Sequence, residues 1–230
     1  IKYWETLKEE LKWNRRFLTN TNLLEDLGWD SFFNTQFVLQ STDKMYRARV
    51  HHKAESPTYD QNEMMCPSKE IVGGGRANPL GIPYLYLCDN PETVLYEVRA
   101  SFLDELSVGI FKLKDSEVKT KIVDFTEDTS LFRIKKVNEI IKASLLRDKI
   151  SKDLSKPMRR YDTEIEYIPT QFICEFIKVY TGSSGIRFRS SLHPSGNNIV
   201  IFDQDKIECV DVKLEKITSL KLKSNTMTNI

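Results

Sequence analysis

The chain has 230 residues, of which 40% are apolar and 10% aromatic, with only 9 glycines and 8 prolines. This composition is typical of a globular protein with a sizeable core, and it excludes a disordered or fibrous chain. Lys and Arg number 34 and Asp and Glu number 33, so the net charge is +1. Neither sign forms the long block expected of an arm that binds nucleic acid or a membrane.

The sequence carries no recognisable targeting segment. Its apolar runs are shorter than the roughly 20 residues that a membrane-spanning helix needs. Lys2, Glu5 and Lys8 occupy the region where a signal peptide has its hydrophobic run. We therefore expect a cytoplasmic protein with no membrane partner and no direct nucleic-acid partner. The chain begins with Ile1 inside a helical pattern, as expected of a piece of a longer or processed protein.

Residues 1–40 have a helical pattern, because apolar residues recur at steps of three and four. These residues are Trp4, Leu7 and Leu11 in a first segment and Leu23, Leu24 and Leu27 in a second. A polar cluster at 19–22 separates the segments and supplies N-cap candidates for the second. We predict a helical N-terminal extension over residues 1–42.

From residue 45 onward, short runs rich in apolar and β-branched residues favour strands. The predicted strands cover residues 45–50, 84–87, 108–113, 121–125, 185–188, 199–202 and 207–212. A polar stretch at 53–75 has two prolines and three consecutive glycines, the composition of a mobile loop that can cover a site. A second, basic loop is predicted at 152–162.

Helices are predicted between these strands. The clearest begins where Asn90 can cap a helix whose first residue is Pro91. Its apolar stripe consists of Val94, Leu95, Val98 and Phe102. Two more helices are predicted at 131–150 and 170–180. Together, the elements of residues 43–230 predict an α+β domain with a mixed β core and inserted helices.

Cysteine and histidine give no pattern typical of a metal site. The four cysteines lie far apart, with no C-x-x-C pair, and the three histidines form no H-E-x-x-H motif. These residues are Cys66, Cys88, Cys174 and Cys209, and His51, His52 and His193. We expect buried or idle thiols and no metal.

The segment 73–83 is the first candidate for chemistry. Its glycines let backbone amides approach a ligand, and the planar guanidinium of Arg76 suits phosphate. It is neither a P-loop nor a Rossmann fingerprint, because no Gly-Lys-Ser/Thr follows and the glycines precede the strand. The alternative is a turn with a surface arginine.

Further candidates lie on the predicted strands and helices, each with a structural alternative. Tyr86 is either a packing aromatic or a ring that stacks on a ligand. Glu97, beside the apolar stripe of its helix, is either solvated or held near a ligand. Arg47 and Arg49 share one strand face, where they form salt bridges or bind a pyrophosphate. The serines at 190–191 end a strand, where they usually bond to the backbone.

In this order, the segments resemble the RES domain family, which is named for an arginine, a glutamate and a serine. The resemblance runs from about residue 45 to about residue 202. It lies in the segments 46–49, 75–87, 93–99, 169–171 and 185–191. It implies a fold similar to that of mono-ADP-ribosyltransferase toxins, and an activity on NAD+. Residues before Met45 resemble the N-terminal extension of longer family members.

The resemblance also implies roles for individual residues. Arg76, Tyr86, Glu97 and Ser190 are implied as catalytic, and Ser191 is an alternative serine because the doublet leaves the register open by one. The implied substrate contacts are Tyr46, Arg47, Arg49, Asn78 and Ser191. One carboxylate suffices for this chemistry, because the ring nitrogen of nicotinamide is already cationic and leaves neutral without a general acid.

The expected activity is cleavage of the nicotinamide–ribose bond of NAD+ by phosphorolysis or hydrolysis, as in toxins of toxin–antitoxin pairs. Inorganic phosphate is a possible co-substrate, and no prosthetic group is expected. The alternatives are ADP-ribosyl transfer to a macromolecule and a binding module without catalysis. Expected partners are an antitoxin or other regulatory protein and further copies of the chain.

Overall fold

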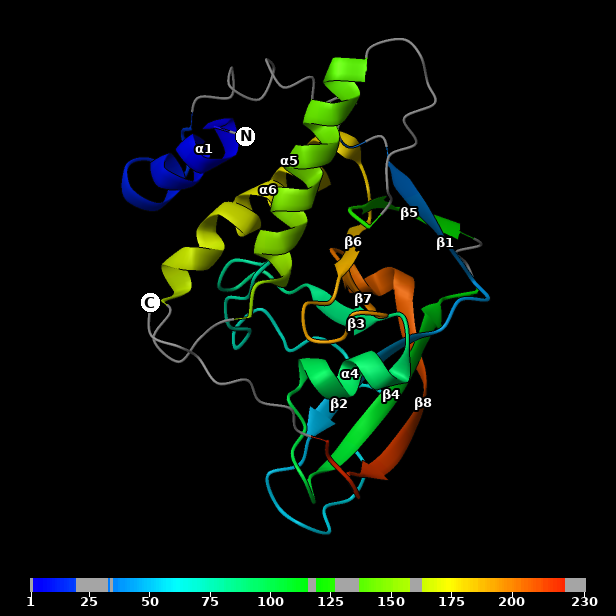
Figure 1. The fold of residues 1–230 in the computed structure, drawn as a ribbon. Helices are drawn as coiled ribbons and strands as arrows, with labels where there is room; N and C mark the ends of the chain where they lie inside the picture. Colours follow the sequence, from blue (N-terminus) through cyan, green and yellow to red (C-terminus); the bar gives the residue numbers. More distant parts are fainter. Residues whose placement is uncertain are drawn as a thin grey trace.

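A computed structural model describes residues 2–19, 33, 35–115, 119–126, 137–157 and 163–221. Within these residues the chain forms one mixed eight-stranded sheet with helices against it (Figure 1). The predicted α+β class is confirmed. The predicted second helical segment at 23–27 lies outside the described residues, and the predicted likeness to ADP-ribosyltransferases stays a prediction.

The strand order in the sheet is β1-β5-β6-β7-β3-β2-β4-β8. The strands are β1 (Gln36–Gln40), β2 (Met45–Val50), β3 (Leu85–Cys88), β4 (Glu105–Leu113), β5 (Lys119–Asp124), β6 (Gly185–Arg189), β7 (Asn197–Ile201) and β8 (Ile207–Lys216). Neighbouring strands are antiparallel except β5 and β6, which are parallel. Strands β2 and β3 share a single paired position, Tyr46 with Cys88.

Each of the strands predicted from the sequence is present. The sheet also contains β1, whose residues were predicted to be helical. That prediction is wrong for Gln36–Gln40, which pairs with β5 along its whole length. Tertiary packing explains the difference. Leu39 is 1% exposed and packs with buried side chains of neighbouring strands, and this packing overrides the helical pattern of the preceding residues. The first strand of the sheet therefore comes from residues predicted as an extension, whereas the division at 42 and 43 stays a prediction.

The helices are α1 (Lys2–Trp13), α4 (Pro91–Glu97), α5 (Val137–Ser155) and α6 (Ile168–Thr181), with short 3-10 turns η1 (Glu164–Tyr167) and η2 (Gln204–Lys206). α4 starts as predicted, because the side chain of Asn90 accepts a hydrogen bond from the Thr93 amide. α5 extends to Ser155, so the first residues of the predicted basic loop are helical.

α4 is shorter than its apolar pattern predicts. Arg99 has φ 52°, and the amides of Arg99 and Ala100 bond to the carbonyls of Tyr96 and Leu95. This is a Schellman ending, with arginine at the left-handed position that glycine usually occupies. Phe102, predicted on the stripe, is therefore outside the helix and exposed. The early ending places Glu97 in the last turn of α4.

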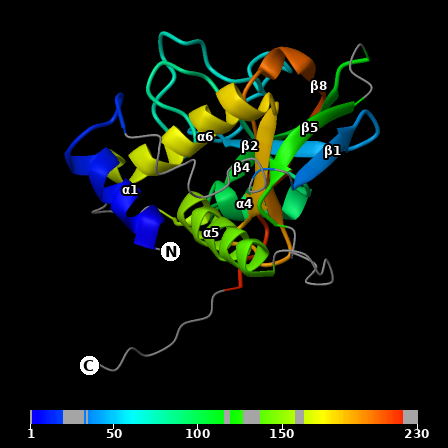
Figure 2. The ribbon, with the colours of Figure 1, turned by 90° about the horizontal axis from the view of Figure 1, so that it is seen from above.

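Three helices cover one face of the sheet. α1, α5 and α6 lie on the same side in both views (Figures 1 and 2). Their buried side chains form one core with the strands beneath: Trp4, Leu7 and Leu11 of α1, Ile150 and Leu154 of α5, Ile173 and Ile177 of α6, and Ile186 and Val200 of the sheet. α1 is therefore part of the main core.

The opposite face of the sheet is covered by the predicted loop at 53–75. Met64 is fully buried there, among side chains of β2, β3 and β4. The guanidinium groups of Arg47 and Arg49 donate hydrogen bonds to the carbonyls of Met64 and Glu63. Strand β2 thus fixes this part of the loop.

In the part of the chain that the structure describes, no helix has the length and apolar character needed to cross a membrane. Nor do three or more His, Cys, Asp or Glu side chains gather there as a metal ion would require.

Candidate active site

A cavity of about 370 Å³ lies between α4, the start of β2, the segment 73–83, which we call the glycine-rich loop, and η1. This volume is within the range of small-molecule sites. We call it the cleft. Its lining includes Tyr46, Arg47, Arg76, Tyr86, Glu97 and Asn198. Five of these six residues were candidates from the sequence, and they come from segments far apart in the chain.

Glu97 is held at the cleft by two hydrogen bonds to one of its oxygens. Oε1 accepts from the Ser190 hydroxyl at 2.7 Å and from the Asn198 amide at 2.8 Å. The other oxygen, Oε2, has no hydrogen-bond partner among the described residues. The carboxylate is therefore fixed in orientation, with one oxygen left for a ligand.

Ser190 lies behind Glu97 and does not line the cleft. It is 6% exposed, and its hydroxyl also accepts hydrogen bonds from the amides of Leu192 and His193. Because these amides occupy the hydroxyl oxygen, its proton points to Glu97. The serine orients the glutamate. Ser191 instead donates to the carbonyl of Ser155 at the end of α5.

Asn198 presents its NH2 group to Glu97 because its other end is occupied. Its Oδ1 accepts a hydrogen bond from the Cys88 thiol at 3.3 Å. Burial raises the pKa of Cys88, and the charges of Glu97 and Asp89 raise it further, so Cys88 stays a protonated donor. The Asn198 side chain is therefore fixed at both ends.

The glycine-rich loop is anchored by the phenol of Tyr86. Its hydroxyl accepts from the Ala77 amide at 2.9 Å and donates to Asn78 Oδ1 at 2.8 Å. Asn78 is 2% exposed and donates to three loop carbonyls. Burial, the largest cause, raises the pKa of Tyr86, which keeps the phenol protonated. Asn78 thus holds the loop and is not part of the cleft lining.

Gly75 is required at its position by close packing. A Cβ there would lie 2.6 Å from both Asn78 Oδ1 and Tyr86 OH, and these two atoms are fixed by hydrogen bonds to each other. By contrast, a Cβ on Gly73 would meet nothing within 4 Å. The absence of a side chain at Gly75 lets the loop pass directly over the tyrosine.

Arg76 reaches the cleft from this loop. Its guanidinium donates weak hydrogen bonds to the last carbonyls of α5, those of Leu154 and Ser155, at 3.4 and 3.3 Å. Its own carbonyl accepts a hydrogen bond from the Thr170 hydroxyl at 2.6 Å. Among the described residues, no carboxylate forms an ion pair with Arg76. A half-buried cation in this situation favours an anionic ligand.

Arg47 and Arg49 were predicted to act as a pair, but the structure places them in different environments. Arg47 lines the cleft, and burial, together with the charge of Arg49, lowers its pKa. It forms no ion pair with a described carboxylate. Arg49 lies outside the cleft, with its guanidinium 4.4 Å from the ring centre of Tyr59. Only Arg47 is placed to contact a ligand in the cleft.

The structure thus brings together Tyr46, Arg47, Arg76, Tyr86 and Glu97, and it places Arg49, Asn78, Ser190 and Ser191 outside the cleft lining. Sequence reasoning missed Asn198 and Tyr167. The signal for Asn198 was present: two asparagines begin the apolar strand β7, and a polar side chain buried at the start of such a strand needs a partner. No local signal distinguishes Tyr167.

Comparisons with known proteins identify the family of the chain. Residues 44–223 match the RES domain family, and the chain belongs to this family. Among solved structures, the chain is similar to one described as the crystal structure of the M. tuberculosis MbcT-MbcA toxin-antitoxin complex. The TM-score is 0.47 at 14% identity, and the match covers 85% of this chain and 93% of that chain. A search of curated proteins found no match.

Proposed function

We propose that this RES domain protein cleaves the nicotinamide–ribose bond of NAD+ and acts as a toxin by depleting it. The observation that carries the proposal is the arrangement of Glu97: one carboxylate oxygen is fixed by Ser190 and Asn198, and the other is free in a cleft that also contains Arg76. Membership of the RES family supports the substrate.

The charge distribution of the cleft suits the two ends of this substrate. Arg47 and Arg76, cations without ion-pair partners among the described residues, would bind the pyrophosphate. The free oxygen of Glu97 would lie beside the ribose and accept a hydrogen bond from one of its hydroxyls. Tyr46 and Tyr86 would offer their rings to the nicotinamide.

In the reaction, the bond between ribose C1′ and the nicotinamide nitrogen breaks, and its electron pair leaves with neutral nicotinamide. Positive charge develops on the ribose, and the fixed carboxylate of Glu97 stabilises it. An oxygen of water or of inorganic phosphate then bonds to C1′, and with water a proton is lost to solvent. The carboxylate needs no proton of its own at any step.

Product identification tests this proposal. The purified chain is incubated with NAD+, with and without inorganic phosphate, and the products are separated by chromatography. Free nicotinamide with ADP-ribose indicates hydrolysis, and free nicotinamide with ADP-ribose 1″-phosphate indicates phosphorolysis. Label from NAD+ on a macromolecule in a lysate would indicate ADP-ribosyl transfer instead. Intact NAD+ under all conditions would contradict the proposal. An antitoxin partner and homo-oligomers stay predictions.

A further inference from the structure

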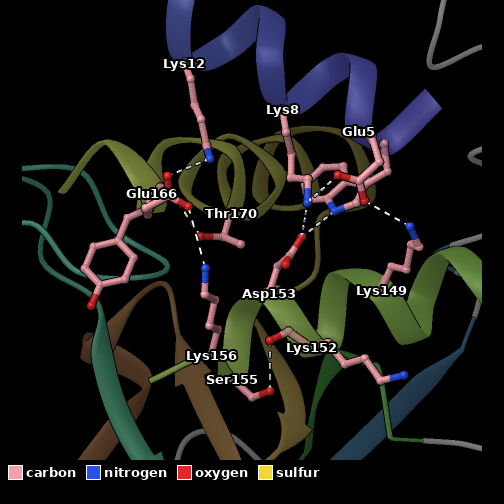
Figure 3. A network of polar contacts seen from close by, with 12 residues as sticks. Glu5, Lys8, Lys12, Lys149, Lys152, Asp153, Ser155, Lys156, Glu166 and Thr170 are labelled. Carbon is pink, nitrogen blue, oxygen red and sulfur yellow. Dashed lines mark hydrogen bonds and ion pairs between the residues drawn. The ribbon is translucent and has the colours of Figure 1, made fainter. Parts of the chain in front are cut away.

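Helix α1 lies before the residues that match the RES family, yet it is tied to the elements that form the cleft. Charged side chains of α1 point to α5 and to η1, where they form a row of ion pairs (Figure 3). The ion pairs at the two ends of this row join α1 to different elements: to α5 at one end and to η1 at the other.

The first end joins α1 to α5 alone. Glu5 pairs with Lys149 at 2.9 Å, and Lys8 pairs with Asp153 at 3.1 Å. The indole of Trp4 donates to the same Asp153 carboxylate at 2.6 Å. These contacts add to the apolar packing of α1. Asp153 directly precedes Leu154, whose carbonyl accepts a hydrogen bond from Arg76, whereas Lys149 lies one turn earlier in α5 and does not line the cleft.

The second end is centred on Glu166 and joins three elements. Lys12 of α1 pairs with Glu166 Oε1 at 2.8 Å, and Lys156, directly after α5, lies 3.8 Å from Oε2. The Lys12 side chain is 11% exposed, so this ion pair is shielded from solvent more than a surface pair is. Glu166 therefore fixes η1 relative to both helices.

From Glu166 the connection to the cleft is short. The next residue, Tyr167, lines the cleft. The Thr170 hydroxyl lies within hydrogen-bond distance of the Tyr167 carbonyl, at 2.9 Å, and of the Arg76 carbonyl, at 2.6 Å. The side chain of Gln171 donates to the carbonyl of Gly75 at 2.8 Å. The wall that contains Tyr167 and Arg76 is thus held by the residues that follow Glu166.

We propose that Lys12 and Glu166 are a positioning pair through which α1 fixes the wall of the cleft formed by Tyr167 and the Arg76 loop. The proposal rests on the proposed function for its effect on NAD+. A wall that is ordered in the free protein binds substrate at a smaller entropic cost, so the pair affects binding more than the chemical step. Neither residue lines the cleft.

The test compares three variants of the whole chain. Lys12→Met removes the charge but keeps the apolar stem that packs on the helices. Lys12→Arg keeps the charge, and Lys149→Met removes the matched pair at the other end of α1. If Lys12→Met does not fold, Glu166→Gln removes this ion pair, together with the longer one to Lys156, with little change of shape. Two readouts are taken: amide hydrogen exchange of residues 74–78 and 166–171, and kcat and KM for NAD+.

We expect Lys12→Met to speed exchange in both segments and to raise KM roughly three- to tenfold with kcat within about twofold of wild type. Lys12→Arg should restore both, and Lys149→Met should change neither. Unchanged exchange in Lys12→Met, equal effects of Lys149→Met, or a loss confined to kcat would overturn the proposal. If wild type releases no nicotinamide, the proposed function fails, whereas the exchange experiment still decides whether the pair holds the wall.

Discussion

The carboxylate of Glu97 accepts a hydrogen bond from Asn198 at 2.8 Å, although 101 positions separate the two residues in the sequence. Because the Cys88 thiol holds the other end of the amide, Asn198 keeps its NH2 group on Glu97 without needing the substrate to order it. A carboxylate that is already fixed in orientation needs little free energy of reorganisation when positive charge develops nearby. In the proposed function, Asn198 therefore holds the carboxylate that stabilises the cationic ribose.

Asn198→Leu tests this relationship. The substitution leaves Glu97 with only the Ser190 bond, so we expect nicotinamide release to slow about ten- to a hundredfold, the cost of one hydrogen bond to a charged group. Initial rates at saturating NAD+ give the measurement. Asn62→Leu, in the loop on the opposite face of the sheet, is the control. A wild-type rate in Asn198→Leu would show that Ser190 alone orients the carboxylate.

The glycine-rich loop offers a matched pair of substitutions. In Gly75→Ala the new methyl would lie 2.6 Å from Asn78 Oδ1 and Tyr86 OH, so the loop must shift. We expect the free energy of unfolding to fall by about 1–3 kcal/mol and turnover to drop with it. Gly73→Ala has open space and should match wild type. Urea unfolding and nicotinamide release check both, and equal behaviour of the two variants would argue against tight packing at Gly75.

The two arginines of β2 give a second comparison. Arg47→Met removes a cation that lines the cleft, and we expect KM for NAD+ to rise about tenfold or more, because a charged contact to the pyrophosphate is lost. Arg49→Met removes a cation that stacks on Tyr59 outside the cleft, and KM should stay within about twofold. Steady-state kinetics separate them. An equal rise of KM in the two variants would mean that bound NAD+ extends past the residues that line the cleft.

The ion pairs of α1 predict a dependence of stability on pH. Hydrogen bonds from Lys8 and Lys149 lower the pKa of Glu5 below its ordinary value. A carboxylate with a lowered pKa in the folded state contributes stability above its unfolded pKa, near 4.3, and the contribution is lost as the pH falls through the folded value. Because the side chain is half-exposed, the contribution is small, about 0.5 kcal/mol or less.

The measurement is the difference in unfolding free energy between wild type and Glu5→Gln at several pH values. We expect the difference to be largest above about pH 5 and to shrink below about pH 4. Glu9→Gln, on the same helix and exposed, is the control and should show no such trend. If the difference in unfolding free energy grew toward acid pH, the pKa of Glu5 would be raised in the folded state, contrary to this prediction.

Much of the fold follows from local pattern. Runs of β-branched and apolar residues predicted every strand from β2 onward, because these patterns reflect burial against the sheet itself. Strand β1 was missed because five residues, Gln36–Gln40, follow a longer helical pattern, and only the distant pairing with β5 makes them a strand. The early end of α4 was missed because arginine, not glycine, adopts the left-handed conformation at position 99.

The sequence predicted five of the residues that line the cleft, but their arrangement was harder to predict. Alternation along β2 correctly placed Arg47 and Arg49 on one face, yet the cleft reaches only the first. The resemblance to the RES family identified Ser190, whereas its position behind Glu97 depends on the amides of Leu192 and His193. The hydrogen bond from Ser190 to Glu97 joins residues 93 positions apart, and no local pattern encodes it.

The most direct test of the account is Glu97→Gln, because it keeps the shape of the side chain and removes the negative charge. If Glu97 stabilises the cationic ribose, kcat for nicotinamide release should fall by about a hundredfold or more. The Kd for NAD+, measured by calorimetry, should change by less than about threefold, since Arg47 and Arg76 still bind the pyrophosphate. A kcat close to that of wild type, with or without phosphate, would contradict the account.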